Sequence, residues 1–344
     1  MRNVGLGSLA LCACLSFSCT DSNGGNGSSG GASGSSNGGR AGGGSGGSAA
    51  GTGGSAGKAG TGGSSAGSGG TGGNSAGSGG TGGSSAGSGG SGGSIQGWPD
   101  ASNTGIPDGA CPNGLSAATP AQIRPDSGAV IECVRFAAGL PYVDQDTTNV
   151  TYRYCRFETT SGGAFVNLQN GPVTFEDCEF EGGAGTWIRA SYFADNLTVR
   201  RCDFSGMANA VEFGTSNVRI EDNYVHDFGN VSEDQHADGF QTEGADGFQI
   251  LHNTILMNEV WGATSALLVS GDDAAVKDNL VAGAGYTVHV AGDMEVTGNR
   301  FSTVFHDKCG FFGPVYPESL DPSGVWSNNL WHDGPKSGQQ VPAP

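Results

Sequence analysis

The apolar residues of this chain recur in a short alternating phrase rather than in a helical pattern. The phrase reads apolar-x-apolar-x-x-(Cys or Asn)-x-apolar, which is the period-two alternation of β-strands. Its copies are AVIECVRF from Ala129, VTYRYCRF from Val150, VTFEDCEF from Val173, LTVRRCDF from Leu197, VRIEDNYV from Val218, FQILHNTI from Phe248, AAVKDNLV from Ala274, MEVTGNRF from Met294 and GVWSNNLW from Gly324. Each copy is too short to bury its own apolar face, so successive copies must stack. We therefore predict an all-β fold, a parallel solenoid of about nine coils.

The first, third, sixth and eighth positions of the phrase are expected to face inward. The eighth position is apolar in every copy: Phe136, Phe157, Phe180, Phe204, Val225, Ile255, Val281, Phe301 and Trp331. The sixth position changes from Cys155, Cys178 and Cys202 to Asn223, Asn253, Asn279, Asn299 and Asn329. Stacked asparagines can bond to one another and to the turn backbone, which satisfies polar groups inside the coil. The three cysteines are predicted to be buried, stacked thiols, because parallel Cβ vectors do not suit a disulfide torsion.

Outward positions of the phrase carry charges that alternate in sign from copy to copy. The fourth position reads Glu132, Arg153, Glu176, Arg200 and Glu221. Opposite charges stacked on neighbouring strands support the strand register modestly. His252 lies between Asp222 and Asp278 at the fifth position. We interpret it as the cation of a surface ladder in preference to a catalytic acid.

A second strand is predicted just before each phrase, and its outward residues form a polar strip. Aligning the inward residues of successive copies leaves one outward row: Asn167, Arg189, Glu212, Gln241, Leu268 and His289. Two residues before Asn167 and Arg189 of this row, Phe165 and Trp187 are expected to be exposed. Polar groups beside exposed aromatic rings suit the binding of sugars. We therefore predict substrate binding by Trp187, Glu212, Gln241 and His289, with Arg189 as a candidate catalytic base.

Three connections between a phrase and the next strand are longer than the rest, and they are expected to wall a groove beside this strip. They insert HDFGNVSEDQHAD, LMNEVWGATS and STVFHDKC. Loops on a rigid scaffold commonly carry function. In the first, His236 and Asp238 lie two residues apart where the loop enters a strand, so that they could face the same side and act as base and orienter.

The acidic residues around the first loop could also hold a metal. Asp234, Asp238 and Glu243 are candidate ligands for Ca²⁺, because carboxylate oxygens are its usual partners. Trp261, in the second loop, is a further candidate for contact with a sugar. The alternative is that Asp238 only begins a turn and that the acids are solvated. The sequence contains no zinc pattern, nucleotide loop or Ser-His-Asp elbow.

The amino end has the composition of a targeting segment followed by a tether. Residues 1–19 combine a basic start, a short apolar run and small residues before cysteines, which predicts a signal peptide of lipoprotein type with lipidation at Cys14 or Cys19; an ordinary secretory signal is the alternative. Residues 20–96 consist mostly of Gly, Ser, Ala and Thr, and this composition predicts a disordered linker. The β-helix domain with an amino-terminal cap is expected over 97–335, and a tail over 336–344. We expect an exported protein, either an outer-membrane or cell-surface lipoprotein or a secreted one, that contacts a membrane only through its lipid anchor.

The net charge limits the kinds of binding partner that are expected, and the cysteine count indicates disulfide bonds. The formal net charge of −18 argues against nucleic acid, since phosphate binding needs a basic stripe, and it suits calcium. Nine cysteines occur, of which three belong to the signal, and the even number left favours disulfides. Cys133 is one residue out of the inward column, so Cys111 could reach it and form a bridge. A monomer is expected.

The ordered domain resembles a right-handed parallel β-helix of the pectate-lyase-like superfamily, through its asparagine column above all. Its ends are similar to a narrower group of secreted bacterial β-helix proteins of unassigned activity, through WPDASNTGIP from Trp98, KCGFFGPV from Lys308 and VWSNNLWHDG from Val325. The resemblance implies binding and cleavage of acidic polysaccharide, by β-elimination with a basic residue beside Ca²⁺ or by hydrolysis between paired carboxylates. The paired aspartates and Gly-His-Gly turn of the hydrolases are missing, and Arg189 is the one basic candidate on the strip.

These observations predict an exported, surface-tethered β-helix protein that binds polysaccharide along the strip and could cleave it as a lyase or hydrolase. The alternative is a non-catalytic adhesin or structural spacer at the cell surface, and a sugar epimerase ranks third. A fold of this kind hosts both enzymes and binding proteins, so the choice depends on the site.

Overall fold

The computed structural model describes residues 97–159, 165–183, 185–229, 236–242, 244–258, 262–317 and 320–344. All of them lie in the second of two compact units, 83–344. The predicted signal peptide 1–19 and linker 20–96, with Cys14 and Cys19, lie outside the described residues. Within the described ranges, no helix has the length and apolar character needed to cross a membrane.

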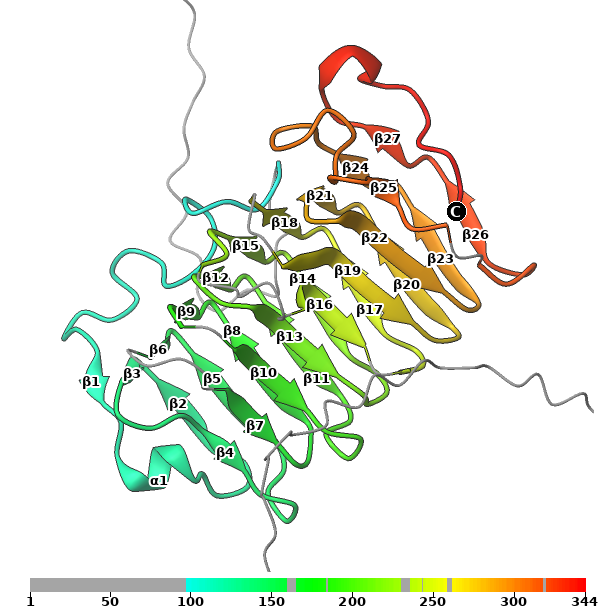
Figure 1. Cartoon of the computed structure of the whole chain (residues 1–344). Helices are drawn as coiled ribbons and strands as arrows, with labels where there is room; N and C mark the ends of the chain where they lie inside the picture. Colours follow the sequence, from blue (N-terminus) through cyan, green and yellow to red (C-terminus); the bar gives the residue numbers. More distant parts are fainter. Residues whose placement is uncertain are drawn as a thin grey trace, which may run out of the picture. The chain divides into compact units, whose positions relative to one another are not determined.

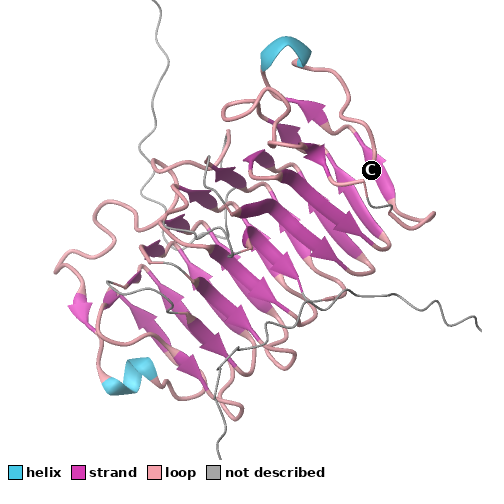
Figure 2. Ribbon diagram, viewed as in Figure 1, coloured by secondary structure: helices cyan, strands magenta, loops and turns pink. Residues whose placement is uncertain are grey.

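Three parallel β-sheets run along the domain, and each coil adds one strand to each sheet (Figures 1 and 2). Sheet A contains β1 (Ser116–Ala117), β3 (Val134–Phe136), β6 (Arg156–Glu158), β9 (Glu179–Glu181), β12 (Asp203–Ser205), β15 (Tyr224–His226), β18 (Thr254–Met257), β21 (Leu280–Gly283), β24 (Arg300–Phe301) and β27 (Leu330–Trp331). Sheet B contains β2 (Val130–Glu132), β5 (Val150–Arg153), β8 (Val173–Glu176), β11 (Leu197–Arg200), β14 (Arg219–Glu221), β17 (Gln249–Leu251), β20 (Ala274–Lys277), β23 (Met294–Thr297) and β26 (Val325–Ser327). Sheet C contains β4 (Tyr142–Val143), β7 (Val166–Leu168), β10 (Thr186–Ala190), β13 (Asn209–Phe213), β16 (Ala237–Thr242), β19 (Ala263–Ser270), β22 (Tyr286–Ala291) and β25 (Gly313–Val315). Two short helices, α1 (Pro120–Ile123) and η1 (Gly334–Lys336), lie near the two ends of the solenoid.

Each copy of the phrase forms one strand of sheet B, a tight turn and one strand of sheet A. In the copy that starts at Val150, β5 ends at Arg153, Tyr154 has φ +55°, and β6 starts at Arg156. The fifth position is left-handed in every copy: Cys133, Tyr154, Asp177, Arg201, Asp222, His252, Asp278, Gly298 and Asn328. One left-handed residue turns the chain through the corner without a loop, which suits the Asp, Asn and Gly found there.

The core confirms the predicted inward positions. In the second copy these are Val150, Tyr152, Cys155 and Phe157, each at most 1% exposed. The rings of the eighth position stack from coil to coil, with centroids 4.9 Å apart for Phe136 and Phe157, 4.6 Å for Phe157 and Phe180, and 4.4 Å for Phe180 and Phe204. These spacings match the rise of about 4.8 Å between parallel strands, so the ring stack and the sheets share one repeat.

The sixth position forms a hydrogen-bonded asparagine column, as predicted. Asn279 Nδ2 donates to Asn299 Oδ1 at 2.9 Å and to the carbonyl of Ile250 at 3.0 Å. Its Oδ1 accepts from Asn253 N at 2.9 Å and from Asn253 Nδ2 at 3.0 Å. In the earlier coils Cys155, Cys178 and Cys202 are free, buried thiols. The prediction of stacked thiols in place of a disulfide is therefore confirmed.

The count of coils and the carboxyl end differ slightly from expectation. About seven coils have regular strands in all three sheets. In the first coil the sheet C strand, β4, has only two residues, and the last coil, which contains β26 and β27, contributes no strand to sheet C within the described residues. The segment 336–344, expected to be a tail, packs on the last coil. Val341 is 1% exposed, and its N–H donates to the carbonyl of Asn329 at 2.8 Å. This segment covers apolar surface that an end coil of a solenoid would otherwise expose.

Charge pairs lie on the outside of the coils. Arg153 pairs with Glu132 on the neighbouring rung, and Arg200 Nη2 lies 2.8 Å from Glu176 Oε1. These two pairs confirm the predicted ladder between the first and second rungs and between the third and fourth rungs of the fourth position. Glu221, in contrast, pairs with Arg219 of its own strand.

The amino-terminal cap is a strap, residues 97–114, that crosses several coils. Trp98 stacks on His252 with centroids 5.4 Å apart, and Gly105 N donates to the carbonyl of Arg201 at 2.9 Å. At its other end the strap is held by the expected disulfide between Cys111 and Cys133. Trp98 also meets His332 edge-on at 6.3 Å. The opening and closing motifs noted in the sequence are therefore in contact.

We expect the Trp98 end of the strap to loosen as the pH rises. The hydrogen bond from His252 to Asp222, 2.7 Å long, raises the pKa of His252 above its ordinary value despite partial burial, and the charge of Asp278 adds to this. A raised folded-state pKa gives stability that is present below the unfolded pKa and is lost as pH rises through the folded value. Hydrogen exchange of residues 97–105, corrected for its intrinsic pH dependence, should therefore quicken between about pH 6 and about pH 8.

The control is His252→Gln, which should exchange quickly in this segment at both pH values. The amides of β8 in sheet B serve as an internal reference and should not change in either protein. Equal protection of residues 97–105 at the two pH values in the wild type would contradict the proposal that protonated His252 holds the Trp98 end of the strap in place.

Candidate functional site

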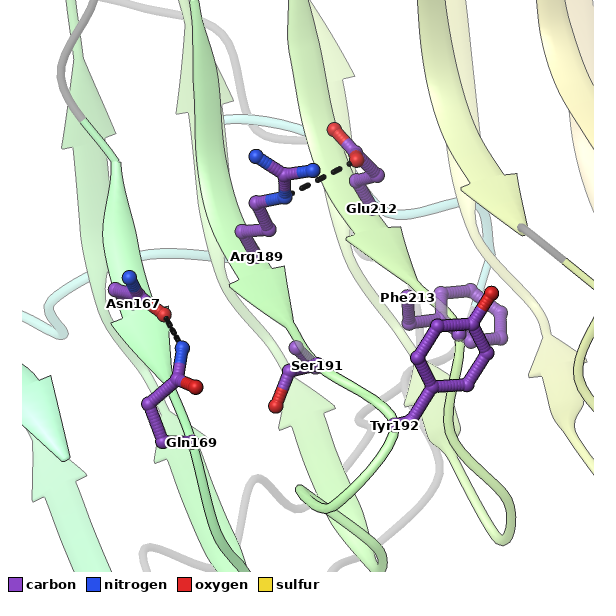
Figure 3. A pocket seen from close by; sticks show the side chains of 9 residues that line it. Asn167, Gln169, Arg189, Ser191, Tyr192, Glu212 and Phe213 are labelled. Carbon is purple, nitrogen blue, oxygen red and sulfur yellow. Dashed lines mark hydrogen bonds and ion pairs between the residues drawn. The ribbon is translucent and has the colours of Figure 1, made fainter. Parts of the chain in front are cut away.

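A groove of about 260 Å³ lies on the outer face of sheet C (Figure 3). Its lining residues are Asn167, Gln169, Arg189, Ala190, Ser191, Tyr192, Glu212, Phe213 and Gly214. The register of β7, β10 and β13 aligns Asn167, Arg189 and Glu212 in one row. The predicted alignment of the polar strip is therefore confirmed over these strands, and the strip forms the floor of the groove.

Arg189 and Glu212 form an ion pair on this floor. Arg189 Nε lies 3.3 Å from Glu212 Oε1, and Thr186 Oγ1 donates to Glu212 Oε2 at 3.0 Å. The arginine side chain is 50% exposed and the glutamate 14%. A guanidinium paired with a carboxylate holds its proton and offers its remaining N–H groups as donors. The geometry of Arg189 thus suits ligand binding better than the proton abstraction that the sequence suggested.

Trp187 does not lie on the groove, contrary to the prediction. It is 1% exposed and packs at 6.3 Å from Phe180. Trp187 and Ile188 are both buried, because the strict alternation of β10 breaks at its first residues, where the chain enters sheet C from the corner. The binding role assigned to Trp187 as an exposed aromatic is therefore wrong.

Other aromatic rings lie at or near the groove. Tyr192, which lines it, is 61% exposed, and Phe165, whose ring centroid lies 5.9 Å from Arg189 Cζ, is 37% exposed. Phe193, next to Tyr192 in the same turn, is 71% exposed. The Tyr192 ring lies over Gly214, where an added Cβ would sit 3.2 Å from the ring, so the glycine makes this close approach possible. The sequence-based prediction missed Tyr192 and Phe193. Two adjacent aromatic residues in the otherwise polar turn SYFADN were the signal that could have found them.

Of two polar side chains in the groove, Gln169 and Ser191, only Gln169 has a hydrogen-bond partner among the described residues. Gln169 donates to Asn167 Oδ1 within the groove. Ser191 Oγ is buried and has no hydrogen-bond partner among the described residues. A buried hydroxyl without a partner is costly, so a ligand that bonds to it gains from its satisfaction.

Asp238 is a buried carboxyl on β16, two strands along from Arg189 on β10 in sheet C. Ser265 Oγ donates to its Oδ1 at 2.5 Å, and its backbone N–H donates to Asn209 Oδ1 at 2.7 Å. Its Oδ2 has no hydrogen-bond partner among the described residues. Burial raises the pKa of Asp238 to about 7, and the charge of nearby Glu212 acts in the same direction against the lowering effect of Ser265. Asp238 therefore exchanges its proton near neutral pH.

His236 is not brought to Asp238. It is exposed, and its Nδ1 lies 3.3 Å from Thr264 Oγ1. A register shift between Ala237 and Asp238 separates the two side chains, since Asp238 is buried within the sheet. No interaction of the described residues joins His236 to Asp238, so the expected base and orienter pair is not formed.

The remaining predicted residues lie along the same outward row or outside the described part. Gln241 Oε1 accepts from Asn209 Nδ2 at 3.0 Å, next to Glu212 in the register. His289 follows Leu268 and stacks on Tyr316 with centroids 4.4 Å apart. Trp261, Asp234 and Glu243 lie outside the described residues.

Of the three predicted calcium ligands, only Asp238 lies within the described residues. Its carboxyl is buried, protonated through much of the neutral range and shares one oxygen with Ser265, which does not suit a calcium ligand. Across the described ranges, no three His, Cys, Asp or Glu residues are grouped so that they could hold a metal ion. We derive no chemical step through calcium.

Comparison with known proteins identifies the fold. The family model described as "Right handed beta helix region" matches residues 138–302, which run from just before β4 to just after β24. No curated protein and no solved structure matches the chain. The three stacked parallel sheets and the inward asparagine column agree with that match. Residues 138–302 are therefore similar to the right-handed β-helix family, and the described domain has the right-handed parallel β-helix fold, consistent with the pectate-lyase-like superfamily.

Proposed function

We propose that this protein is an exported, surface-tethered β-helix that binds polysaccharide in the groove on sheet C. The observation that carries the proposal is the meeting of two kinds of surface. Arg189, Glu212 and the unpartnered Ser191 hydroxyl supply donors and acceptors, and Tyr192 supplies an exposed ring at the edge, with exposed Phe193 beside it in the same turn. A sugar presents hydroxyls at its rim and apolar C–H faces, which fit such a combination.

Export and tethering are supported by the sequence alone. The apolar segment before Cys14 and Cys19 fits a lipoprotein signal, and the Gly/Ser-rich stretch 20–96 fits a flexible spacer. A tether of this kind would present the groove to polymers outside the cell. A non-catalytic adhesin is the form of this proposal in which binding is the whole function.

Cleavage is a second candidate, favoured by two neighbouring carboxyls. Asp238 has a pKa of about 7, and Glu212 lies near enough for its charge to contribute to that shift. Glycoside hydrolysis requires a pair of carboxyl groups, one of which holds a proton to donate. Asp238 would hold that proton, and Glu212, bonded to Thr186 and paired with Arg189, would be the second carboxyl.

Affinity electrophoresis in gels that contain single polysaccharides tests the binding proposal. The double variant Tyr192→Ala/Phe193→Ala should bind about tenfold more weakly than the wild type on any polymer that retards it, because each lost ring contact is worth about 0.7 kcal/mol. Val130→Ala is the control, since Val130 is 61% exposed on β2 in sheet B. Equal retardation of the double variant and wild type would exclude the groove as the binding site.

The same polymers, incubated with the protein and assayed for new reducing ends and unsaturated ends, test cleavage. Asp238→Asn should bind normally and release product at least about 100-fold more slowly, the usual effect of losing a general acid. A wild type that binds and releases no product would assign the protein to the adhesin or spacer class.

A further inference from the structure

The outward row of sheet C continues beyond the groove and ends in aromatic rings. From Leu268 the row passes to His289 and then to Tyr316, whose N–H donates to the carbonyl of Val288 at 2.9 Å. His289 and Tyr316 stack with centroids 4.4 Å apart and an interplanar angle of 9°. The groove and these rings are therefore two parts of one continuous face, which runs from β7 to β25 in Figure 1.

Three further rings complete what we call the end cluster: Tyr286, His289, Phe311, Phe312 and Tyr316. Tyr286 meets Tyr316 edge-on at 5.2 Å and packs on Phe312 at 5.5 Å. Phe311 and Phe312 are 60% and 61% exposed. Because these rings hold one another in place, the cluster is a preformed surface. Adjacent phenylalanines exposed to this degree on a folded domain mark a contact surface.

The outward row of this face, from Asn167 to His289, contains no unpaired positive charge. Arg189 is paired with Glu212, and His289 is neutral because burial lowers its pKa to about 4. Lys308 is exposed on the connection that carries the end cluster, outside this row, with Asp307 next to it in the sequence. The chain as a whole has a formal net charge of −18. A polyanion laid along this row would meet the carboxylate of Glu212 with no unpaired cation of the row to balance it.

We propose that the ligand of this face is an uncharged polysaccharide long enough to contact both the groove and the end cluster, which acts as a second binding subsite. This inference rests on the proposed function of the groove. Five strand-to-strand steps separate Arg189 on β10 from Tyr316 after β25, a span of about 24 Å. A short oligosaccharide reaches one part, and only a longer chain reaches both. The occupant thus differs in charge from the acidic polysaccharide that the superfamily resemblance implied.

The test compares neutral and acidic probes on the full exported chain. The neutral probes are hydroxyethyl cellulose, galactomannan and arabinoxylan with their trisaccharides, and the acidic probes are polygalacturonate and alginate. Binding is measured by calorimetry in about 20 mM and about 200 mM NaCl. At least one neutral polymer should bind with an affinity that changes by less than about twofold between the two salts, because no counterions are released. The polyuronates should bind at least about tenfold more weakly.

The variant Phe312→Ala/Tyr316→Ala tests the second subsite. It should bind the neutral polymer about tenfold more weakly and the matching trisaccharide, held by the groove, with unchanged affinity. Tyr316→Phe keeps the ring and should bind like the wild type, which separates loss of contact from misfolding. Tyr192→Ala/Phe193→Ala should weaken both ligands.

Each other outcome overturns a defined part of this inference. If a polyuronate binds more tightly than the neutral polymers and its affinity falls steeply as the salt concentration rises, the ligand is not an uncharged polysaccharide. The groove would then remain a polysaccharide-binding site. Polymer binding that depends on Tyr192 and Phe193 but not on Phe312 and Tyr316 overturns the second subsite. Binding of none of the probes overturns both this inference and the proposed function.

Discussion

Replacing Asn279 with alanine should lower the free energy of unfolding by about 3 to 5 kcal/mol. Asn279 Oδ1 accepts from both Asn253 N and Asn253 Nδ2, and its Nδ2 donates to Asn299 Oδ1 and to the carbonyl of Ile250. Asn279 and its two neighbours in the column are at most 2% exposed, so no water replaces the lost amide. Each buried group left without a partner costs about 1 to 3 kcal/mol. Several such groups arise from this one change.

Urea unfolding followed by circular dichroism measures this effect. The matched control is Asn149→Gly, because Asn149 is exposed and has φ +58°, a conformation that glycine adopts freely. It should change stability by no more than about 0.5 kcal/mol. If Asn279→Ala lowered stability no more than Asn149→Gly, the column would not be a main source of the stability of the solenoid.

Replacing Asp238 with asparagine should stabilise the domain at alkaline pH and remove a pH dependence. Burial raises the pKa of Asp238 to about 7, whereas an aspartate in the unfolded chain titrates near 3.9. The folded state therefore binds the proton more tightly, and this contribution is complete below about pH 4 and is lost as pH rises through about 7. The difference of about three pH units corresponds to at most about 4 kcal/mol. Asparagine can still accept the hydrogen bond from Ser265 and carries no charge at any pH.

The measurement is the urea midpoint of wild type and variant at pH 4 and pH 8. The variant should gain stability over the wild type at pH 8 and show little advantage at pH 4. Asp146→Asn is the control, since Asp146 is exposed, and it should leave the difference between the two pH values unchanged. A wild type and an Asp238→Asn variant with parallel stability profiles would show that Asp238 is ionised and stabilised in the folded state.

The fold was predictable because its determinants are local and repeated. The phrase that starts at Val150 contains the strand alternation, the left-handed turn residue and the inward column within eight residues. Stacking then follows from burial, since no single copy can cover its own apolar face. The disulfide of Cys111 and Cys133 and the pairing of His252 with Asp222 were also predictable, because both depend on the register of that phrase.

The site was less predictable because it depends on departures from the repeat. Trp187 is buried where the alternation of β10 breaks, and a register shift at Ala237 buries Asp238 and separates it from His236. Tyr192 and Phe193 lie in a connection, outside the aligned strands, so no alignment of strands could place them. Strand periodicity says nothing about such positions, although they decide which side chains reach the groove.

The sequence by itself determined the parallel coils, the inward columns and the outward row from Asn167 to His289, because each follows from a period of two within a strand and one strand per coil. Only the tertiary structure decided which members of that row meet a ligand surface. In the folded chain Trp187 is buried in the core, Tyr192 lies over Gly214, and Tyr316 stacks on His289. These outcomes depend on corners and connections, where side-chain direction is set by contacts between coils rather than by the repeat within one.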